Sequence, residues 1–214
     1  MTTPLVVVGA GGFGRETLDV IEAVNRAGGD TTFKLLGVLD DEPSAISLDR
    51  LSCREIPYLG TVEKWLRGDD EAEYLIAVGA PSARRRLAML LEASERTPAS
   101  AVHPNAVIGS AGIIGRGSII CGGVQVSTNI RIGAYVHLNP NATIGHDCVL
   151  SDYVSVNPAA TVSGECTIGE GALLGAACTI LQGVRIGAHA MVGASACVVR
   201  DVPAGITVKG VPAR

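Results

Sequence analysis

The pattern of hydrophobic positions divides the chain into two parts with different periods. From Val102 to Val198 every sixth residue is a branched aliphatic, and no insertion resets the phase. These positions are Val102, Ile108, Ile114, Ile120, Val126, Ile132, Leu138, Ile144, Leu150, Val156, Val162, Ile168, Leu174, Ile180, Ile186, Val192 and Val198. A sustained period of six belongs to neither an α-helix nor an ordinary strand, so this part is predicted to be a repeat structure.

A second column of small or β-branched residues follows each aliphatic by four positions, as Ala106, Ala142 and Cys148 illustrate. A triangular prism with walls of short strands explains both columns, because one aliphatic per hexapeptide fills the axis and a compact residue fits near each corner. Three hexapeptides make one coil of 18 residues, which predicts a left-handed parallel β-helix. Glycines directly after the aliphatics, such as Gly145, are expected where turns need positive φ or close backbone approach. Three cysteines, Cys148, Cys166 and Cys178, are expected to pack in the walls.

The first part of the chain, residues 1–96, alternates strand and helix patterns. Residues 5–8 and 33–39 are predicted strands, residues 15–27 have helical spacing, and a short helix is expected at 61–66. A further strand is predicted at 74–78, followed by a helix that Ser82 would N-cap. This order predicts a small α/β half-Rossmann domain of the βαβαβα type. Residues 97–214 form the predicted β-helix domain.

Composition and charge narrow the possible partners. The chain has 214 residues, 27 glycines, 3% aromatic residues and a formal net charge of −4. An acidic chain has no general attraction to nucleic acid or to an anionic membrane, so neither partner is expected. The first residues lack the charged start of a signal peptide, and no apolar run is long enough to span a membrane, which predicts a cytoplasmic protein. The spacing of the six cysteines indicates neither a disulfide framework nor a zinc ribbon.

A glycine loop in the first domain is a candidate ligand site. Gly9, Gly11 and Gly14 match GxGxxG between a strand and a helix, where backbone N–H groups can face a phosphate. Asp40 and Asp41 at the end of the neighbouring strand could accept hydrogen bonds from a base or ribose. The alternative is a tight turn that lets the helix and strand pack, because the domain supplies only half of a dinucleotide fold.

Among the four histidines, His146 is the candidate for acid–base chemistry. It stands two residues after Ile144, at an outward corner of the prism, and Asp147 follows it. A carboxylate beside an imidazole fixes its tautomer and makes it a better general base. By contrast, His103 is interpreted as a cap of the first coil, and His137 and His189 as surface residues. The run 84–86 of three arginines is interpreted as a solvated helix face, with a phosphate contact as the alternative.

The residues resemble a known family across nearly the whole chain. GAGGFG, the strand end VLDD, the strand IAVGA and a hexapeptide domain ending DVPAGITVKGVPAR are similar to bacterial sugar acetyltransferases. That group includes the UDP-4-amino-sugar N-acetyltransferases of bacillosamine and perosamine pathways and the sialic acid O-acetyltransferases. The resemblance implies homotrimers that bind acetyl-CoA between neighbouring prisms and hold a nucleotide sugar on the first domain.

The resemblance also implies roles for individual residues. The catalytic pair falls on His146 and Asp147, and the Asn near the catalytic base corresponds to Asn139. The implied sugar-nucleotide contacts are Gly11, Gly12, Phe13, Asp40, Asp41 and Gly79. Phe13 departs from the His frequent in this loop, so its contact would be through the backbone only. The implied acetyl-CoA contacts are Ser155, Ala176 and Ala194, and Ser155 stands where relatives often carry a second His.

Coil spacing adds one assignment from geometry. Gly164 follows His146 by one coil of 18 residues, so it should stack on His146 at roughly 4.8 Å, and its N–H is an oxyanion-hole candidate. The predicted reaction is acetyl transfer from acetyl-CoA to the amino group of a nucleotide-linked 4-amino sugar, without a metal or a covalent enzyme intermediate. Two alternatives remain: O-acetylation of a sugar hydroxyl, and a non-catalytic β-helix scaffold that senses a nucleotide.

Overall fold

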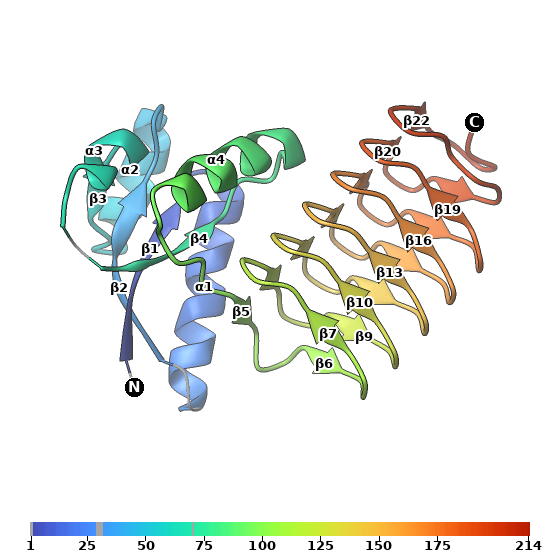
Figure 1. Ribbon diagram of the computed structural model, residues 1–214, viewed down its shortest axis with the longest axis horizontal. Helices are drawn as coiled ribbons and strands as arrows, with labels where there is room; N and C mark the ends of the chain where they lie inside the picture. The colour runs from blue at the N-terminus through green and yellow to red at the C-terminus, as the bar shows by residue number, and fades with distance from the viewer. Residues whose placement is uncertain (1, 29–31, 70) are drawn as a thin grey trace. The chain divides into compact units, whose positions relative to one another are not determined.

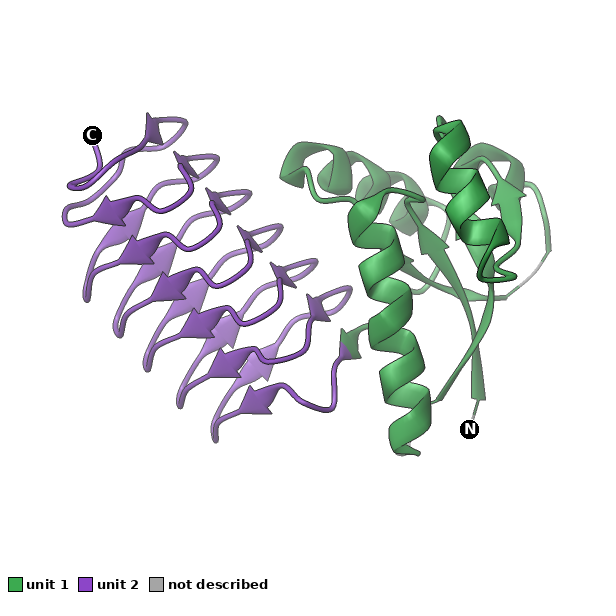
Figure 2. Ribbon diagram, turned by 180° about the vertical axis from the view of Figure 1, so that it is seen from behind, with its two compact units in different colours: residues 1–101 green, residues 102–214 purple. Residues whose placement is uncertain are grey.

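The computed structural model describes residues 2–28, 32–69 and 71–214. The chain forms two compact units, residues 1–101 and 102–214 (Figures 1 and 2). The first unit extends to residue 101, beyond the boundary predicted after residue 96, although Ala101 is also the first residue of a β-helix strand. The predicted fold class, a half-Rossmann domain followed by a left-handed parallel β-helix, is confirmed.

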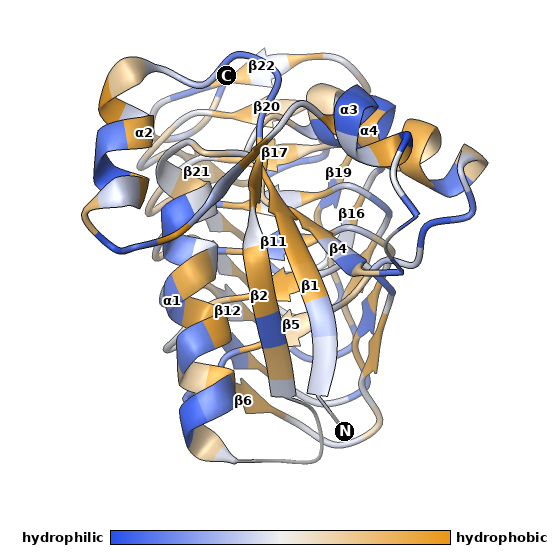
Figure 3. Ribbon diagram, turned by 90° about the vertical axis from the view of Figure 1, so that its left-hand side faces the viewer, coloured by the Kyte–Doolittle hydropathy of each residue, from blue (hydrophilic) through white to orange (hydrophobic). Residues whose placement is uncertain are grey.

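The first unit is built around a four-stranded parallel sheet. Its elements are β1 (Thr2–Val8), α1 (Gly12–Ala27), β2 (Thr32–Leu39), α2 (Ala45–Ser52), β3 (Tyr58–Gly60), α3 (Val62–Leu66), β4 (Glu73–Ile76) and α4 (Pro81–Ala93). The strand order is β3-β2-β1-β4, so β1 is central. Residues 5–8 of β1 are at most 2% exposed, as expected for an interior parallel strand, and Figure 3 shows this segment as continuously hydrophobic.

Two local predictions for this unit were wrong or incomplete. Helix α4 begins at Pro81 with Ala80 as its N-cap, so Ser82 is not the cap. Proline suits the first helical turn because its fixed φ is already helical and the missing N–H would have no partner there. Helix α2 and strand β3 were not predicted. The α2 signal was present in Ser44, whose side chain accepts a hydrogen bond from the Ser47 N–H.

The second unit stacks two-residue strands into three parallel sheets. One sheet contains β6 (Val107–Ile108), β9 (Gln125–Val126), β12 (Thr143–Ile144), β15 (Thr161–Val162), β18 (Thr179–Ile180) and β21 (Cys197–Val198). The second contains β7 (Ile113–Ile114), β10 (Arg131–Ile132), β13 (Val149–Leu150), β16 (Thr167–Ile168) and β19 (Arg185–Ile186). The third contains β5 (Ala101–Val102), β8 (Ile119–Ile120), β11 (His137–Leu138), β14 (Ser155–Val156), β17 (Leu173–Leu174), β20 (Met191–Val192) and β22 (Thr207–Val208).

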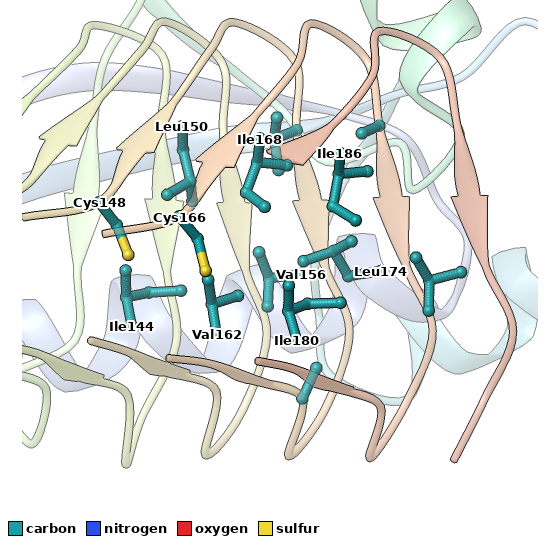
Figure 4. Close-up of a cluster of buried hydrophobic side chains, with 14 of the residues drawn as sticks. Ile144, Cys148, Leu150, Val156, Val162, Cys166, Ile168, Leu174, Ile180 and Ile186 are labelled. Atoms are coloured by element: carbon teal, nitrogen blue, oxygen red, sulfur yellow. The ribbon is translucent and has the colours of Figure 1, made fainter. Parts of the chain in front are cut away.

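The register between coils follows the predicted 18-residue step. Ile144 of β12 pairs with Val162 of β15, and Val162 pairs with Ile180 of β18. From Ile120 onward the aliphatic column and the compact column form one continuous core. Figure 4 shows the sulfur atoms of Cys148 and Cys166 directed into this core, so the prediction of wall packing for these cysteines is confirmed.

The turns of the prism use two kinds of position. The residue three places after the aliphatic has positive φ, as at Asp147 with φ 60°, and many side chains other than glycine occupy it. The glycine directly after the aliphatic serves a different purpose. A Cβ at Gly145 would lie 2.5 Å from the Gly164 nitrogen on the next coil, so close backbone approach is what requires glycine there. Within the described ranges, no helix combines the length and apolarity that crossing a membrane requires.

Candidate functional site

The turn after β12 carries His146 and Asp147 as a hydrogen-bonded pair. His146 Nδ1 lies 2.7 Å from Asp147 Oδ2, and the two side chains are 48% and 44% exposed. A proton on Nδ1 is shared with the carboxylate, which leaves the Nε2 lone pair free to accept a proton from a substrate. The arrangement has the geometry of an oriented general base at an open corner of the prism.

Gly164 lies under the His146 ring on the next coil. A Cβ at position 164 would lie 2.5 Å from both Nε2 and Cε1 of His146, so the reactive edge of the ring covers this glycine. The Gly164 N–H makes no hydrogen bond to any residue that the structure describes. A backbone donor therefore stands beside the base and is available for a developing oxyanion.

Behind this corner, the thiol of Cys148 points inward. Cys148 is fully buried, and its Sγ donates a hydrogen bond to the Ser163 carbonyl oxygen at 3.0 Å. Hydrogen bonding with Cys166, together with burial, raises the pKa of Cys148. Because the thiolate is the nucleophilic form, Cys148 is unsuited to attack a thioester.

Asp147 is held by the preceding coil as well as by His146. Its N–H donates to the Thr128 carbonyl oxygen at 3.1 Å, and its Oδ1 accepts from Asn129 Nδ2 at 2.6 Å. The hydrogen bond from Asn129, followed by that with His146, lowers the pKa of Asp147 below the ordinary 3.8. The carboxylate is therefore ionised at neutral pH. Sequence reasoning missed Asn129, although it precedes Asp147 by one coil.

The first unit has a pocket of about 480 Å³ at the carboxyl ends of β1, β2 and β4. Its lining residues are Val8, Gly9, Asp40, Asp41, Glu42, Val62, Val78, Ala83, Arg86, Leu87 and Leu90. Carboxylates, one arginine and aliphatic side chains thus share one cavity at the edge where parallel sheets commonly bind ligands. Of the predicted contacts, Asp40 and Asp41 line this pocket, whereas Gly11, Gly12, Phe13 and Gly79 do not.

The glycine loop combines packing with open space. A Cβ at Gly14 would overlap the Gly9 carbonyl oxygen, and one at Gly9 would lie 2.8 Å from the Ala77 oxygen. These two glycines let the helix pack against the sheet. Gly11 and Gly12 have no neighbouring atom within 4 Å of an added Cβ, and both are exposed. The packing interpretation of the motif therefore holds for Gly9 and Gly14, and the ligand interpretation of Gly11 stays a prediction.

The two aspartates are already hydrogen-bonded within the unit. Asp40 Oδ2 accepts from the Ala10 N–H at 2.7 Å, and its Oδ1 accepts from the Glu42 N–H at 2.9 Å. Asp41 Oδ1 accepts from the Val62 N–H at 2.9 Å. Asp40 therefore ties the glycine loop to the end of β2, in addition to lining the pocket.

Arg84 departs from the interpretation of residues 84–86 as a solvated face. Its side chain is fully buried, and Nη1 donates to the carbonyl oxygens of Val78 at 2.9 Å and Gly79 at 3.3 Å. Arg85 and Arg86 are exposed, and Arg86 lines the pocket. The prediction was wrong for Arg84 because successive helical residues point about 100° apart, so one member of the run faces the sheet.

The remaining predicted residues lie on other parts of the prism. Asn139 follows β11 and His146 follows β12, so they occupy successive edges of a single chain. Asn139 Nδ2 donates to Asn157 Oδ1 at 3.1 Å, whereas its buried Oδ1 has no hydrogen-bond partner among the described residues. Ala176 and Ala194 share one turn position on adjacent coils; Ala176 is half-buried and Ala194 is exposed. Ser155 is only 2% exposed.

The other histidines have separate structural settings. His103 Nδ1 accepts from the Asn105 N–H at 3.0 Å, a local cap at the start of the first coil. His189 is exposed. His137 is 1% exposed, so the prediction of a surface residue was wrong there. Across the described ranges, no group of three or more His, Cys, Asp or Glu side chains could hold a metal ion.

Comparison with known proteins gives consistent matches. Residues 4–91 match the family model of the PglD N-terminal domain. The chain is 32% identical over 151 residues to GDP-perosamine N-acetyltransferase of Escherichia coli O157:H7, an alignment covering 68% of this chain and 63% of that protein. The chain thus spans less than two thirds of that curated relative.

Solved structures also match this chain over its full length. WeeI from Acinetobacter baumannii AYE is 31% identical, with a TM-score of 0.86 and coverage of 100% of this chain and 99% of that one. The acetyltransferase domain of PglB from Neisseria gonorrhoeae FA1090, in complex with acetyl coenzyme A, is 29% identical, with a TM-score of 0.87 and coverage of 100% and 99%. The likeness therefore includes both units.

Proposed function

Because this chain belongs to the family of hexapeptide-repeat sugar N-acetyltransferases, we propose that it transfers acetyl from acetyl-CoA to the amino group of a nucleotide-linked 4-amino sugar. The observation that carries the proposal is the His146–Asp147 pair placed over Gly164. The name of the Escherichia coli relative supports an amino-sugar acceptor, and the complex of the Neisseria domain supports acetyl-CoA as donor.

The residues of this corner supply each requirement of acetyl transfer. The sugar amine attacks the thioester carbonyl carbon, and His146 Nε2 removes a proton from the attacking nitrogen. Asp147 holds the Nδ1 proton and stabilises the imidazolium that forms. The Gly164 N–H donates to the oxyanion. When the carbon–sulfur bond breaks, the CoA sulfur leaves and takes the proton that His146 carries, which regenerates the base.

No residue of this corner forms a covalent acetyl intermediate in the proposed reaction. The nearest thiol, Cys148, is fully buried and donates its proton to the Ser163 carbonyl oxygen. Both substrates are therefore bound together, and transfer is direct. The expected kinetics are sequential, with no exchange of acetyl onto the enzyme alone.

The nucleotide part of the acceptor is assigned to the pocket of the first unit. Asp41 has one oxygen bound to the Val62 N–H and the other available to a base or ribose donor. Arg86 on α4 places a cation in the same cavity, which suits a diphosphate. Exposed Gly11 and Gly12 at the start of α1 offer backbone donors nearby on the same sheet edge.

A homotrimer is part of the proposal. The pair at His146 is about half exposed in one chain, and Asn139 lies on a different edge of the prism from His146. If a neighbouring prism brings its own edge to this corner, it can supply the second wall of an acetyl-CoA site. Ala176 and Ala194 are the proposed wall residues, whereas the burial of Ser155 argues against a direct cofactor contact there.

The decisive experiment is a screen for free thiol release from acetyl-CoA with UDP- and GDP-linked 4-amino sugars as acceptors. The matching 4-hydroxy sugars serve as controls. Release that depends on the amino group, with the acetylated product identified by mass spectrometry, is the expected result. Release with the hydroxy sugars alone would make the enzyme an O-acetyltransferase. No release above the acceptor-free rate with any sugar would contradict the proposal.

A further inference from the structure

The hydrogen bonds around Asp147 form a chain of three side chains rather than a pair. Asn129 Nδ2 donates to Asp147 Oδ1 at 2.6 Å, while Asp147 Oδ2 lies 2.7 Å from His146 Nδ1. Each carboxylate oxygen thus has a partner of its own. Because each oxygen is held by a different residue, the two contacts together restrain rotation of the carboxylate about the Cβ–Cγ bond.

The backbone places Asn129 and Asp147 in equivalent positions on adjacent coils. Both residues have left-handed φ values, 59° and 60°, and the Asp147 N–H donates to the carbonyl oxygen of Thr128. Asparagine tolerates this conformation, so a turn preference by itself accounts for an Asn at position 129. It does not account for the direction of the side-chain amide, which is aimed at the carboxylate.

We propose that Asn129 is a positioning residue for acetyl transfer, which orients Asp147 and thereby holds His146 in the tautomer protonated at Nδ1. This inference rests on the proposed function of His146 as a base. The amide is a donor that keeps Oδ1 occupied, so Oδ2 remains directed at the imidazole. The required Nε2 lone pair then faces the substrate side.

Among the residues that the structure describes, the hydrogen-bond partners of the Asp147 carboxylate are Asn129 and His146. The Asp147 side chain is 44% exposed, so water competes for both oxygens, and without the Asn129 bond only the contact with His146 would restrain the carboxylate. On the following coil the equivalent turn position holds Glu165, whose Oε2 accepts from Gln182 Nε2 at 3.2 Å. The Glu165 carboxylate therefore receives its hydrogen bond from Gln182, which does not occupy the turn position equivalent to Asn129. The hydrogen bond from Asn129 is the main cause that lowers the pKa of Asp147, which is consistent with a direct contact between the amide and the ionised carboxylate.

Two substitutions at position 129 distinguish the effect of the side-chain amide from the effect of the left-handed turn. Asn129→Gly keeps the left-handed backbone and removes the side chain, whereas Asn129→Asp keeps the shape and replaces the donor with an acceptor. The readout is the ¹⁵N NMR spectrum of the His146 ring at about pH 8.5, some two units above the ordinary histidine pKa. Asn141→Gly is the matched control, since Asn141 has φ 61° at a turn on another edge.

We expect both Asn129 variants to raise the fraction of His146 protonated at Nε2 and to raise the pKa of Asp147, with the larger shift in Asn129→Asp. Their kcat should fall about threefold to tenfold with KM for acetyl-CoA unchanged. In Asn141→Gly the His146 spectrum should match the wild type. Thermal melts of all variants identify any general loss of folding.

The outcomes distinguish this inference from the proposed function. An unchanged His146 tautomer and an unchanged Asp147 titration in folded Asn129→Gly and Asn129→Asp would overturn the role of Asn129, whatever the activity. If the Asn129 variants changed the His146 spectrum but the wild-type protein transferred no acetyl group, the orientation of His146 by Asn129 would be supported. The same result would contradict the proposed function, acetyl transfer with His146 as the base.

Discussion

The imidazole of His146 rests on Gly164, so closely that a Cβ at position 164 would lie 2.5 Å from Nε2. The same glycine carries the N–H proposed for the oxyanion. One residue therefore meets two demands: it leaves room for the ring of the base, and it presents a backbone donor beside it. Any side chain at this position would separate the two groups.

Gly164→Ala is expected to lower kcat at least tenfold, roughly 1.4 kcal/mol or more in transition-state stabilisation, because the methyl group displaces the His146 ring. Steady-state kinetics on the thiol-release assay checks this. Gly112→Ala is the control, since a Cβ there would have its nearest contact at 3.6 Å, an ordinary van der Waals distance. Equal activity in the two variants would show that the ring does not depend on Gly164.

His146→Ala should lower kcat by at least about a hundredfold, because removal of a general base typically costs 10²–10⁴ in rate. The affinity for acetyl-CoA, measured by calorimetry, should change little, since the imidazole acts on the acceptor amine. If kcat stayed within threefold of the wild type, the base would have to be another group.

Asp147 gives a pH-dependent contribution to stability with a definite sign. Its folded pKa lies below the ordinary 3.8, so the ionised form is favoured by folding. The contribution is fully present above the unfolded pKa and is lost as the pH falls through the lowered folded value. The melting-temperature difference between wild type and Asp147→Asn should therefore be constant above about pH 5 and shrink below it. A difference that grows on acidification would contradict the assignment.

Arg84 and Arg85 provide a matched pair in α4. Arg84→Met leaves the carbonyl oxygens of Val78 and Gly79 without their buried donor, and a hydrogen bond to a charged group contributes about 1.5–3 kcal/mol to stability. We expect a loss of that size in the free energy of unfolding by urea titration. The exposed Arg85→Met should stay within about 0.5 kcal/mol of the wild type. Similar losses for both would mean that burial of Arg84 adds nothing.

Asp40→Ala is expected to raise KM for the nucleotide sugar about tenfold or more, and to leave KM for acetyl-CoA unchanged. The structure adds a second effect: without the carboxylate, the N–H groups of Ala10 and Glu42 lose their acceptor, so stability should fall too. Kinetics with each substrate varied in turn, on enzyme shown to be folded by a thermal melt, tests this. An equal change in both KM values would remove the first unit from acceptor recognition.

The sequence alone determined most of the β-helix and the main part of its site. A repeat of 18 residues per coil converts sequence distance into spatial contact, so the stacking of Gly164 on His146 followed from arithmetic. The same step leads from Asn129 to Asp147, and it would have located this contact too. In a repeat, residues that stack on neighbouring coils lie at a constant sequence separation, so the pattern is sufficient to identify these stacked contacts.

Only the tertiary structure revealed the contacts that do not follow the 18-residue spacing. The sequence does not distinguish the three consecutive arginines, but Arg84 alone points inward, and the carbonyl oxygens that accept its hydrogen bonds lie in the loop between β4 and α4. Both oxygens of Asp40 accept hydrogen bonds from backbone N–H groups, and one of these groups lies about thirty residues away in the sequence. No periodic pattern in the sequence predicts this contact. In the first unit each polar partner is set by the path of the chain through a sheet, and that path is a property of the whole domain.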